Sequence, residues 1–130
     1  MFQRLRLSDA ASEDLIWIQM QSVGMFGVDQ ADRYWSLLFQ ALSDIDIDPL
    51  RPGSQSRLDL GEGFRSYRVE LSRHRSRTGV KSSRHVVIYV DFSEQGIGVS
   101  RILHDSMAME RYIPPEHRAG PEAFGRDEEE

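Results

Sequence analysis

The run RHVVIYVDF at residues 84–92 constrains the fold more than any other feature, because Val86 to Val90 are five consecutive apolar residues. Successive side chains of a strand point to opposite faces, so such a run must be buried on both sides. We therefore expect 84–92 to be a central strand. The tight turn Glu94–Gly96 and a second apolar stretch at 97–104 follow directly, which predicts an antiparallel partner strand.

Two helical segments precede this pair of strands, at about residues 9–23 and 29–45. Ser8 is a good N-cap for the first, and Gly24 and Gly27 are expected to close it. In both segments apolar residues recur at helical spacing, which predicts a buried stripe. The members of the second stripe are Tyr34, Trp35, Leu38, Leu42 and Ile45. A short connection between two helices predicts an antiparallel helical hairpin.

The rest of the chain completes an α/β (α+β) pattern. Residues 2–7 and 64–71 have strand character, 72–83 is polar, basic and turn-rich, and 107–112 can form one helical turn. The expected order is β-α-α-β-β-β, with the helical hairpin packed on one face of a small antiparallel sheet. We expect 72–83 to be an extended hairpin loop.

Length and composition favour one domain in a reducing compartment. The chain has 130 residues, no cysteine and a net charge of −5. Its first residues lack the apolar core of a signal peptide and no apolar run could span a bilayer, which predicts a cytoplasmic protein without a membrane partner. Asp44, Asp46 and Asp48 are interpreted as solvated helix-end residues, so no metal and no cofactor is expected. The segment 114–130, rich in Pro, Gly and acids, is predicted to be a flexible tail.

The charge is unevenly distributed. Residues 65–85 contain seven Lys or Arg and one acid, Glu70, although the chain as a whole is acidic. Such a block indicates either an anionic partner or a solvated loop. One hypothesis is an interaction module that binds nucleic acid through 73–84.

Several words of the sequence, taken in order, resemble the ParE toxins of the RelE/ParE superfamily. They are LRLSDAASEDL at 5–15, ADRYWSLLFQAL at 31–42, GFRSY at 63–67, RHVVIY at 84–89 and VSRILHDSMAMERYI at 99–113. The resemblance assigns a toxin domain to 1–113. The basic insertion at 72–83 and the tail at 114–130 depart from the pattern.

The resemblance implies the toxin of a type II toxin–antitoxin pair, which inhibits DNA gyrase by protein binding and is neutralised by a ParD-like antitoxin in a hetero-oligomer. An antitoxin helix and strand would need an apolar groove on the toxin. The residues assigned to that groove are Leu15, Trp17, Ile18, Met20, Trp35 and Leu38. Ordinary core packing is the alternative for each. The residues assigned to target binding are Arg65, Arg101, His104, Met107 and Arg111.

A second reading follows from the RelE-like members, which are ribosome-dependent mRNA endoribonucleases. Cleavage through the 2′-hydroxyl needs a base, an acid and cations for the phosphorane. The candidates are Arg65, Arg101, His104 and Tyr112. Two of them have structural alternatives, since His104 can cap the turn that follows its strand and Arg101 can pair with an internal acid.

Overall fold

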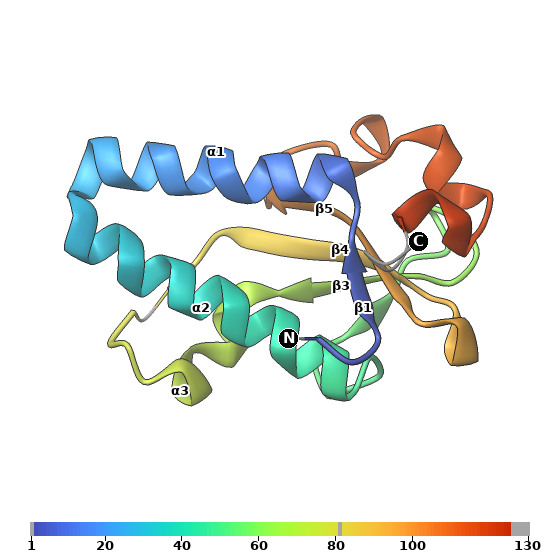
Figure 1. Cartoon of the computed structure of the whole chain (residues 1–130), viewed down its shortest axis with the longest axis horizontal. Helices are drawn as coiled ribbons and strands as arrows, with labels where there is room; N and C mark the ends of the chain where they lie inside the picture. Colours follow the sequence, from blue (N-terminus) through green and yellow to red (C-terminus); the bar gives the residue numbers. More distant parts are fainter. Residues whose placement is uncertain (1, 81, 126–130) are drawn as a thin grey trace.

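The computed structural model describes residues 2–80 and 82–125. Its centre is a five-stranded sheet in the order β1-β5-β4-β3-β2 (Figure 1). The strands are β1 (Leu5–Leu7), β2 (Gln55–Ser56), β3 (Phe64–Arg68), β4 (His85–Asp91) and β5 (Ile97–His104). The prediction for the apolar run is confirmed: β4 is the middle strand and pairs antiparallel with both β3 and β5.

The first strand joins the sheet in a way the sequence did not indicate. β1 pairs with β5 in parallel, with Leu5 opposite Ile97, so the sheet is mixed rather than antiparallel throughout. A parallel pair requires a long crossover connection, and here the helical hairpin and three strands lie between the two. The two-residue strand β2 also adds to the expected order at the far edge.

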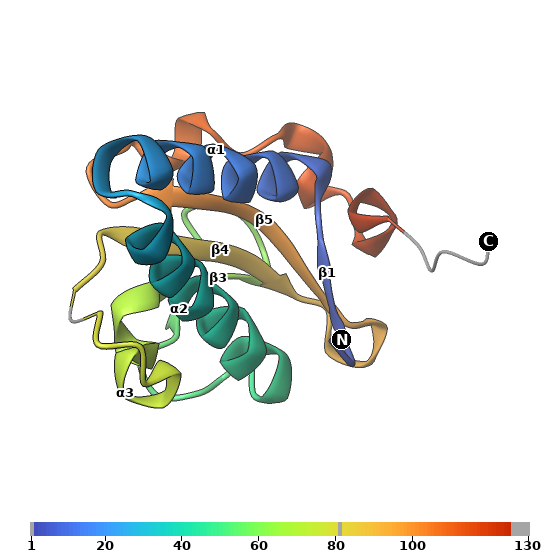
Figure 2. The ribbon, with the colours of Figure 1, turned by 60° about the vertical axis from the view of Figure 1, so that its left-hand side comes forward.

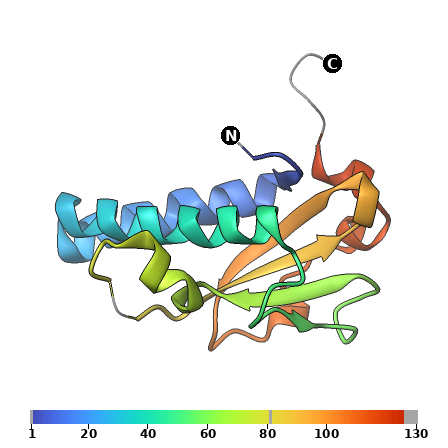
Figure 3. The ribbon, with the colours of Figure 1, turned by 90° about the horizontal axis from the view of Figure 1, so that it is seen from below.

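The helices are α1 (Asp9–Phe26) and α2 (Val28–Ile47). Ser8 caps α1 as predicted, since its Oγ accepts a hydrogen bond from the backbone N–H of Ala11 at 2.9 Å. The helix continues through Gly24, and Gly27 alone makes the turn with a φ of 87°. Figures 2 and 3 show the resulting hairpin lying over one face of the sheet.

Alternate residues of β4 divide the core into two clusters. Val87 and Tyr89 belong to the cluster under the helices, whereas Val86, Ile88 and Val90 belong to a cluster on the opposite face. The helical cluster includes Leu15, Ile18, Leu37, Leu38, Leu42 and Ile45. The other cluster is completed by residues that come late in the chain, Ile113 and Phe124.

The expected flexible tail is wrong for residues 114–125, which we call the C-terminal cover. Short 3-10 turns, η4 (Pro115–Arg118) and η5 (Pro121–Phe124), pack on the second sheet face. The Phe124 ring lies directly on Gly98, where an added Cβ would be 2.5 Å from Cγ of that ring. His117 Nδ1 hydrogen-bonds Ser100 Oγ at 2.7 Å. Two buried rings thus hold a segment whose average composition is polar; the acids Asp127–Glu130 lie outside the described residues.

The basic insertion is likewise structured in part rather than an extended loop. After the 3-10 turn η1 (Val69–Ser72) it forms the short helix α3 (Arg73–Ser76). Arg75 Nε donates to Asp44 Oδ1 at 2.8 Å, and Ser72 Oγ donates to Asp44 Oδ2 at 2.6 Å. Asp44 is therefore a buried anchor for the insertion and not a solvated helix-end residue.

The expectation of a solvated helix-end residue is also wrong for Asp46. Its buried carboxylate accepts hydrogen bonds from the backbone N–H groups of Gln3, Arg4 and Leu5, at 2.8–2.9 Å. The end of α2 thereby fixes the start of β1. A helix-end acid satisfies these donors because the neighbouring edge of β1 has no strand beside it in the sheet order.

Candidate functional site

A groove of about 740 Å³ opens between the hairpin end of the helices and the adjoining ends of β4 and β5. We call it the hairpin groove. Its apolar side is formed by Trp17, Ile18, Met25, Phe26 and Val80. Its polar side is formed by Gln21, Ser22, Gln30, Tyr34, Ser82, Ser83, Arg84, His85 and His104. Pockets with apolar walls and a few convergent polar groups are typical binding sites.

The apolar wall is exposed to an unusual degree. The side chains of Trp17, Met25 and Phe26 are each more than 60 % accessible. Helix α1 buries Leu15 and Ile18 against the sheet, yet it also presents Ile16, Met20 and Val23 outward. A smaller hollow of about 310 Å³ lies among Ile16, Met20 and Trp35. A helix that is apolar on most sides usually has a second partner.

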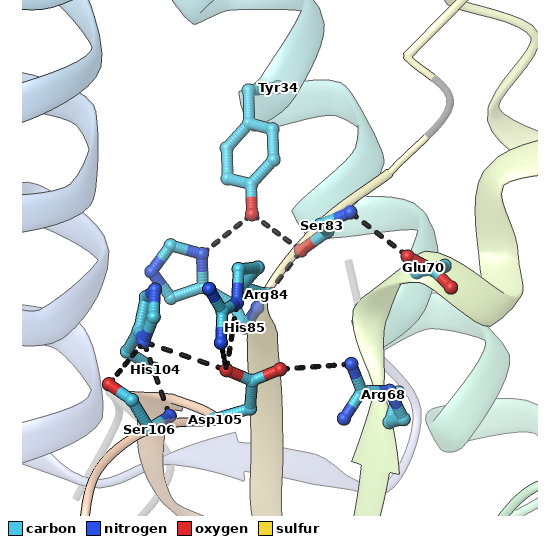
Figure 4. A network of polar contacts seen from close by, with 9 residues as sticks. All are labelled: Tyr34, Arg68, Glu70, Ser83, Arg84, His85, His104, Asp105 and Ser106. Atoms are coloured by element: carbon cyan, nitrogen blue, oxygen red, sulfur yellow. Dashed lines mark hydrogen bonds and ion pairs between the residues drawn. The ribbon is translucent and has the colours of Figure 1, made fainter.

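Three side chains form the polar floor of the groove. Tyr34 Oη lies 2.5 Å from Ser83 Oγ and 2.6 Å from His85 Nδ1 (Figure 4). The backbone N–H of His85 also donates to Ser83 Oγ. Burial, with a smaller effect of neighbouring His104, lowers the pKa of His85 to about 4, so the ring is neutral at pH 7. Burial raises the pKa of Tyr34.

His104 stands beside His85 across the β4–β5 pair, with ring centroids 5.9 Å apart in an edge-to-face arrangement. Its Nδ1 accepts from the backbone N–H of Ser106 at 3.2 Å, which is the turn-capping role that the sequence suggested. The carboxylate of the next residue, Asp105, forms ion pairs with Arg68 and Arg84, and each Nη2–oxygen distance is 3.0 Å. These two guanidinium groups lower the pKa of the Asp105 carboxyl group.

The residues assigned to the antitoxin groove separate into two groups. Leu15, Ile18 and Leu38 lie in the core beneath the helices, so they form little or no accessible surface. Trp17 and Met20 are exposed, and Trp35 is partly buried against the core while lining the smaller hollow. The buried residues of this set belong to the helical stripes that face the sheet, and the exposed residues lie beside those stripes on the helix surface.

Arg101 forms an ion pair with an acid inside the fold, as a half-buried cation requires. Its Nε and Nη2 donate to the two carboxylate oxygens of Asp14 at 2.8 and 2.7 Å, and Nη1 donates to the carbonyl of Tyr112. Asp14 also accepts the backbone N–H of Ile102. This bidentate pair fixes α1 to the edge of β5, so most of the hydrogen-bonding capacity of Arg101 is used within the fold.

Arg65 is remote from Arg101. In the strand register Arg65 lies opposite Tyr89, a residue of the helical-face cluster, whereas Arg101 lies opposite Ile88 of the other cluster. Because residues opposite each other in a sheet share a face, the two arginines are on different faces. The Arg65 guanidinium donates to Ser54 Oγ at 2.7 Å. The four ribonuclease candidates, Arg65, Arg101, His104 and Tyr112, are thus divided between two faces and do not form one acid–base set. Met107 packs partly buried on the second cluster, and Arg111 and Tyr112 are exposed.

Sequence reasoning did not assign Tyr34, Ser83 and Arg84 to a site, although they form the polar side of the groove. The available signal was the facing pair of strands, which places the start of β4 beside the end of β5 and so brings His85 into the neighbourhood of His104. Tyr34 gave no signal, because on the helical stripe it reads as an ordinary core residue.

Among residues 2–80 and 82–125, no helix is long and apolar enough to cross a membrane. In the same part of the chain, no group of three or more His, Cys, Asp or Glu side chains is arranged to hold a metal ion.

A helical hairpin on a small mixed sheet, with an open groove at its hairpin end, defines a small α/β protein with a candidate docking surface. Comparison with known proteins gives the family. The sequence matches the family described as the ParE toxin of the type II toxin–antitoxin system parDE over residues 5–109, and the chain belongs to this family.

The fold has a solved counterpart. A structure described as the chromosomal ParDE toxin–antitoxin system from P. aeruginosa superposes with a TM-score of 0.57, at 14 % sequence identity. The match covers 79 % of this chain and 96 % of the other. No curated protein matches the sequence. The family match ends at Met109, so the C-terminal cover lies beyond it.

Proposed function

We propose that this ParE toxin acts in the cytoplasm by binding and inhibiting DNA gyrase, and that a ParD-like antitoxin neutralises it by docking on α1 and the hairpin groove. The observation that carries the proposal is the exposed apolar surface of α1, in particular Trp17, Met25 and Phe26. Large aromatic and methionine side chains are favoured anchors at protein interfaces. An antitoxin partner is also supported by the family and by the solved relative, since both are described as parts of a toxin–antitoxin system.

Action by binding rather than by catalysis fits the family, which is generally non-enzymatic. It also fits the division of the ribonuclease candidates between the two sheet faces. For the contact with gyrase we propose the accessible members of the predicted set, His104 and Arg111, with Met107 beside them. Arg65 and Arg101 have structural roles, because their guanidinium groups bond Ser54 and Asp14.

The test of gyrase inhibition uses the purified chain and purified gyrase. We expect the toxin to block supercoiling of a relaxed plasmid, and an Arg111→Ala variant to require a higher concentration for the same inhibition. Glu122→Ala, an exposed substitution on the C-terminal cover, is the control and should behave like the unaltered chain. Unchanged supercoiling at saturating toxin would refute gyrase as the target.

The antitoxin is tested separately by expression in bacteria. The toxin alone should arrest growth, and the protein encoded by the adjacent reading frame should restore it. Trp17→Asp should reduce this rescue because it introduces a charge into the apolar wall without touching the core. Full rescue of the Trp17→Asp toxin would show that the antitoxin binds elsewhere.

A further inference from the structure

The basic insertion is a strongly charged feature that the proposed function does not use. From Arg73 to Arg84 the sequence contains five Lys or Arg and no acid, in a chain of net charge −5. This segment begins with α3, which packs beside α2 on the side away from the C-terminal cover (Figure 1). A local excess of positive charge on an acidic protein indicates contact with an anion.

A buried carboxylate fixes α3 in place. Asp44 accepts hydrogen bonds from Ser72 Oγ at 2.6 Å and Arg75 Nε at 2.8 Å, and it is fully buried. Gln40 Nε2 donates to the same carboxylate at 2.9 Å. The charge of Asp44 is therefore compensated inside the fold, and the residues next to Arg75 are held in a defined position. A preordered basic surface loses less conformational entropy on binding than a flexible loop does.

Two arginines beside this anchor carry charges that no carboxylate compensates. Arg77 is exposed and has no hydrogen bond or ion pair within the described part of the chain. Arg73 Nη1 donates to the backbone carbonyl of Glu70 at 3.1 Å, and no acid among the described residues pairs with it. Because a guanidinium carries five N–H donors, both side chains can bind further oxygen acceptors.

The composition of the insertion fits phosphate groups better than a protein surface. Apart from Lys, Arg and His74, residues 73–84 are Ser, Thr, Gly and one Val, and that residue, Val80, lines the apolar wall of the hairpin groove. Arg, Lys, Ser and Thr make many of the contacts to nucleic-acid backbones, whereas protein interfaces depend on aromatic and other large anchors. The lack of an aromatic residue in 73–84 also disfavours single strands, whose bases stack on such rings.

We propose that the basic insertion binds the phosphate backbone of a nucleic-acid double helix through Arg73 and Arg77, with Arg75 and Asp44 holding α3 in place. At helical rise, Arg73 and Arg77 are about 6 Å apart along the axis. A duplex carries one charge per ~1.7 Å of its axis, so both guanidinium groups can meet phosphates whatever the base sequence. This contact is separate from the gyrase and antitoxin contacts and does not depend on them.

The experiment titrates a short fluorescent DNA duplex with the full chain and follows anisotropy. For two phosphate contacts we expect the affinity to fall about 10-fold between ~50 and ~200 mM salt. Arg77→Gln removes a side chain that has no partner in the described fold, and it should reduce this fall to about 3-fold. The double variant Arg73→Gln/Arg77→Gln should show almost no salt dependence.

The matched control is Arg4→Gln, which changes the net charge by the same amount. Arg4 Nη2 donates to the carbonyl of Ser93 in the turn between β4 and β5, outside the insertion. This variant should keep the full salt dependence of about 10-fold. Equal losses in Arg4→Gln and Arg77→Gln would overturn the inference, because the effect would then be one of net charge alone.

Three further probes fix the class of ligand. Tighter binding to the single strand than to the duplex would overturn the inference. Binding to polyglutamate without binding to the duplex would also overturn it, and would assign the insertion to an acidic protein. An RNA duplex of the same sequence is measured alongside, and the tighter of the two duplexes identifies the source of the phosphates. The supercoiling and rescue tests use other residues, so failure here leaves the proposed function standing.

Discussion

The two faces of the sheet are covered in different ways. The helical face lies under two long helices whose core residues, such as Leu42, recur at regular spacing. The opposite face lies under the C-terminal cover, whose short turns are held by Phe124 and His117. The helical cover leaves an apolar groove at its hairpin end, whereas the C-terminal cover uses its large apolar residues internally. The regular helices thus form the main core and also leave apolar side chains exposed, whereas the irregular segment covers its sheet face.

Leu42→Ala should have the largest effect, because it creates a cavity at the centre of the helical face, where Leu42 is fully buried. We expect a loss of about 4 kcal/mol in the free energy of unfolding, within the range for buried Leu→Ala changes. Urea unfolding followed by circular dichroism measures it. A loss below about 1 kcal/mol would mean that the helical face is not the main core.

Phe124→Ala tests whether the C-terminal cover is part of the fold. We expect a loss of about 3 kcal/mol, because the ring is buried against Gly98, Phe92 and His117. The matched control is Glu122→Ala on the same turn, which is exposed and should change stability by less than about 0.5 kcal/mol. If both variants unfold like the unaltered chain, the comparison between the faces fails.

A pH series compares the histidines of the two faces. Burial lowers the pKa of both His85, to about 4, and His117. Below pH 6.5 these histidines become protonated in the unfolded chain but stay neutral in the folded chain. The free energy of unfolding is therefore highest above pH 6.5, and the His85 effect lowers it as the pH decreases toward 4. Between pH 7 and pH 5 the His85 effect lowers the free energy of unfolding by about 2 kcal/mol.

His85→Asn should flatten this pH dependence, with urea unfolding at the two pH values as the measurement. The part that remains reports on His117, which His117→Asn should remove in turn. A pH dependence that neither variant changes would assign the acid sensitivity to other groups.

Trp17→Ala should have the smallest effect on stability, within about 0.5 kcal/mol, because the side chain is 61 % exposed. Its effect on antitoxin binding should nevertheless exceed 10-fold, about 1.4 kcal/mol, as expected for an aromatic anchor. Calorimetric titration with the partner and thermal unfolding of the free chain separate the two quantities. A large drop in melting temperature would instead make Trp17 a core residue.

Element types were predictable wherever a periodic pattern was long. The run Val86–Val90 gave the central strand, and the helical stripes gave the hairpin. The parallel pairing of β1 was not predictable, because a three-residue strand carries no information on its partner. The C-terminal cover was not predicted because the expectation rested on the average composition of the segment, which is polar and hides the effect of two buried rings.

The candidate site depended on a local irregularity. From the turn outward, Asp91 pairs with Ile97 and Tyr89 with Val99, but a register shift then pairs Ile88 with Arg101. That extra residue on β5 brings His104, rather than Leu103, opposite His85. Tyr34 reaches His85 from 51 positions away in the sequence. Neither a bulge nor such a distant contact can be read from local spacing.

The parallel pairing of β1 with β5 also affects the order of assembly during synthesis. Leu5 leaves the ribosome long before Ile97 exists, so the first strand must wait for nearly the whole domain before it can dock. The helical hairpin can form earlier, with its apolar α1 side already exposed. The hairpin groove also needs His85 and His104, however, so it is complete only after β5 has been made.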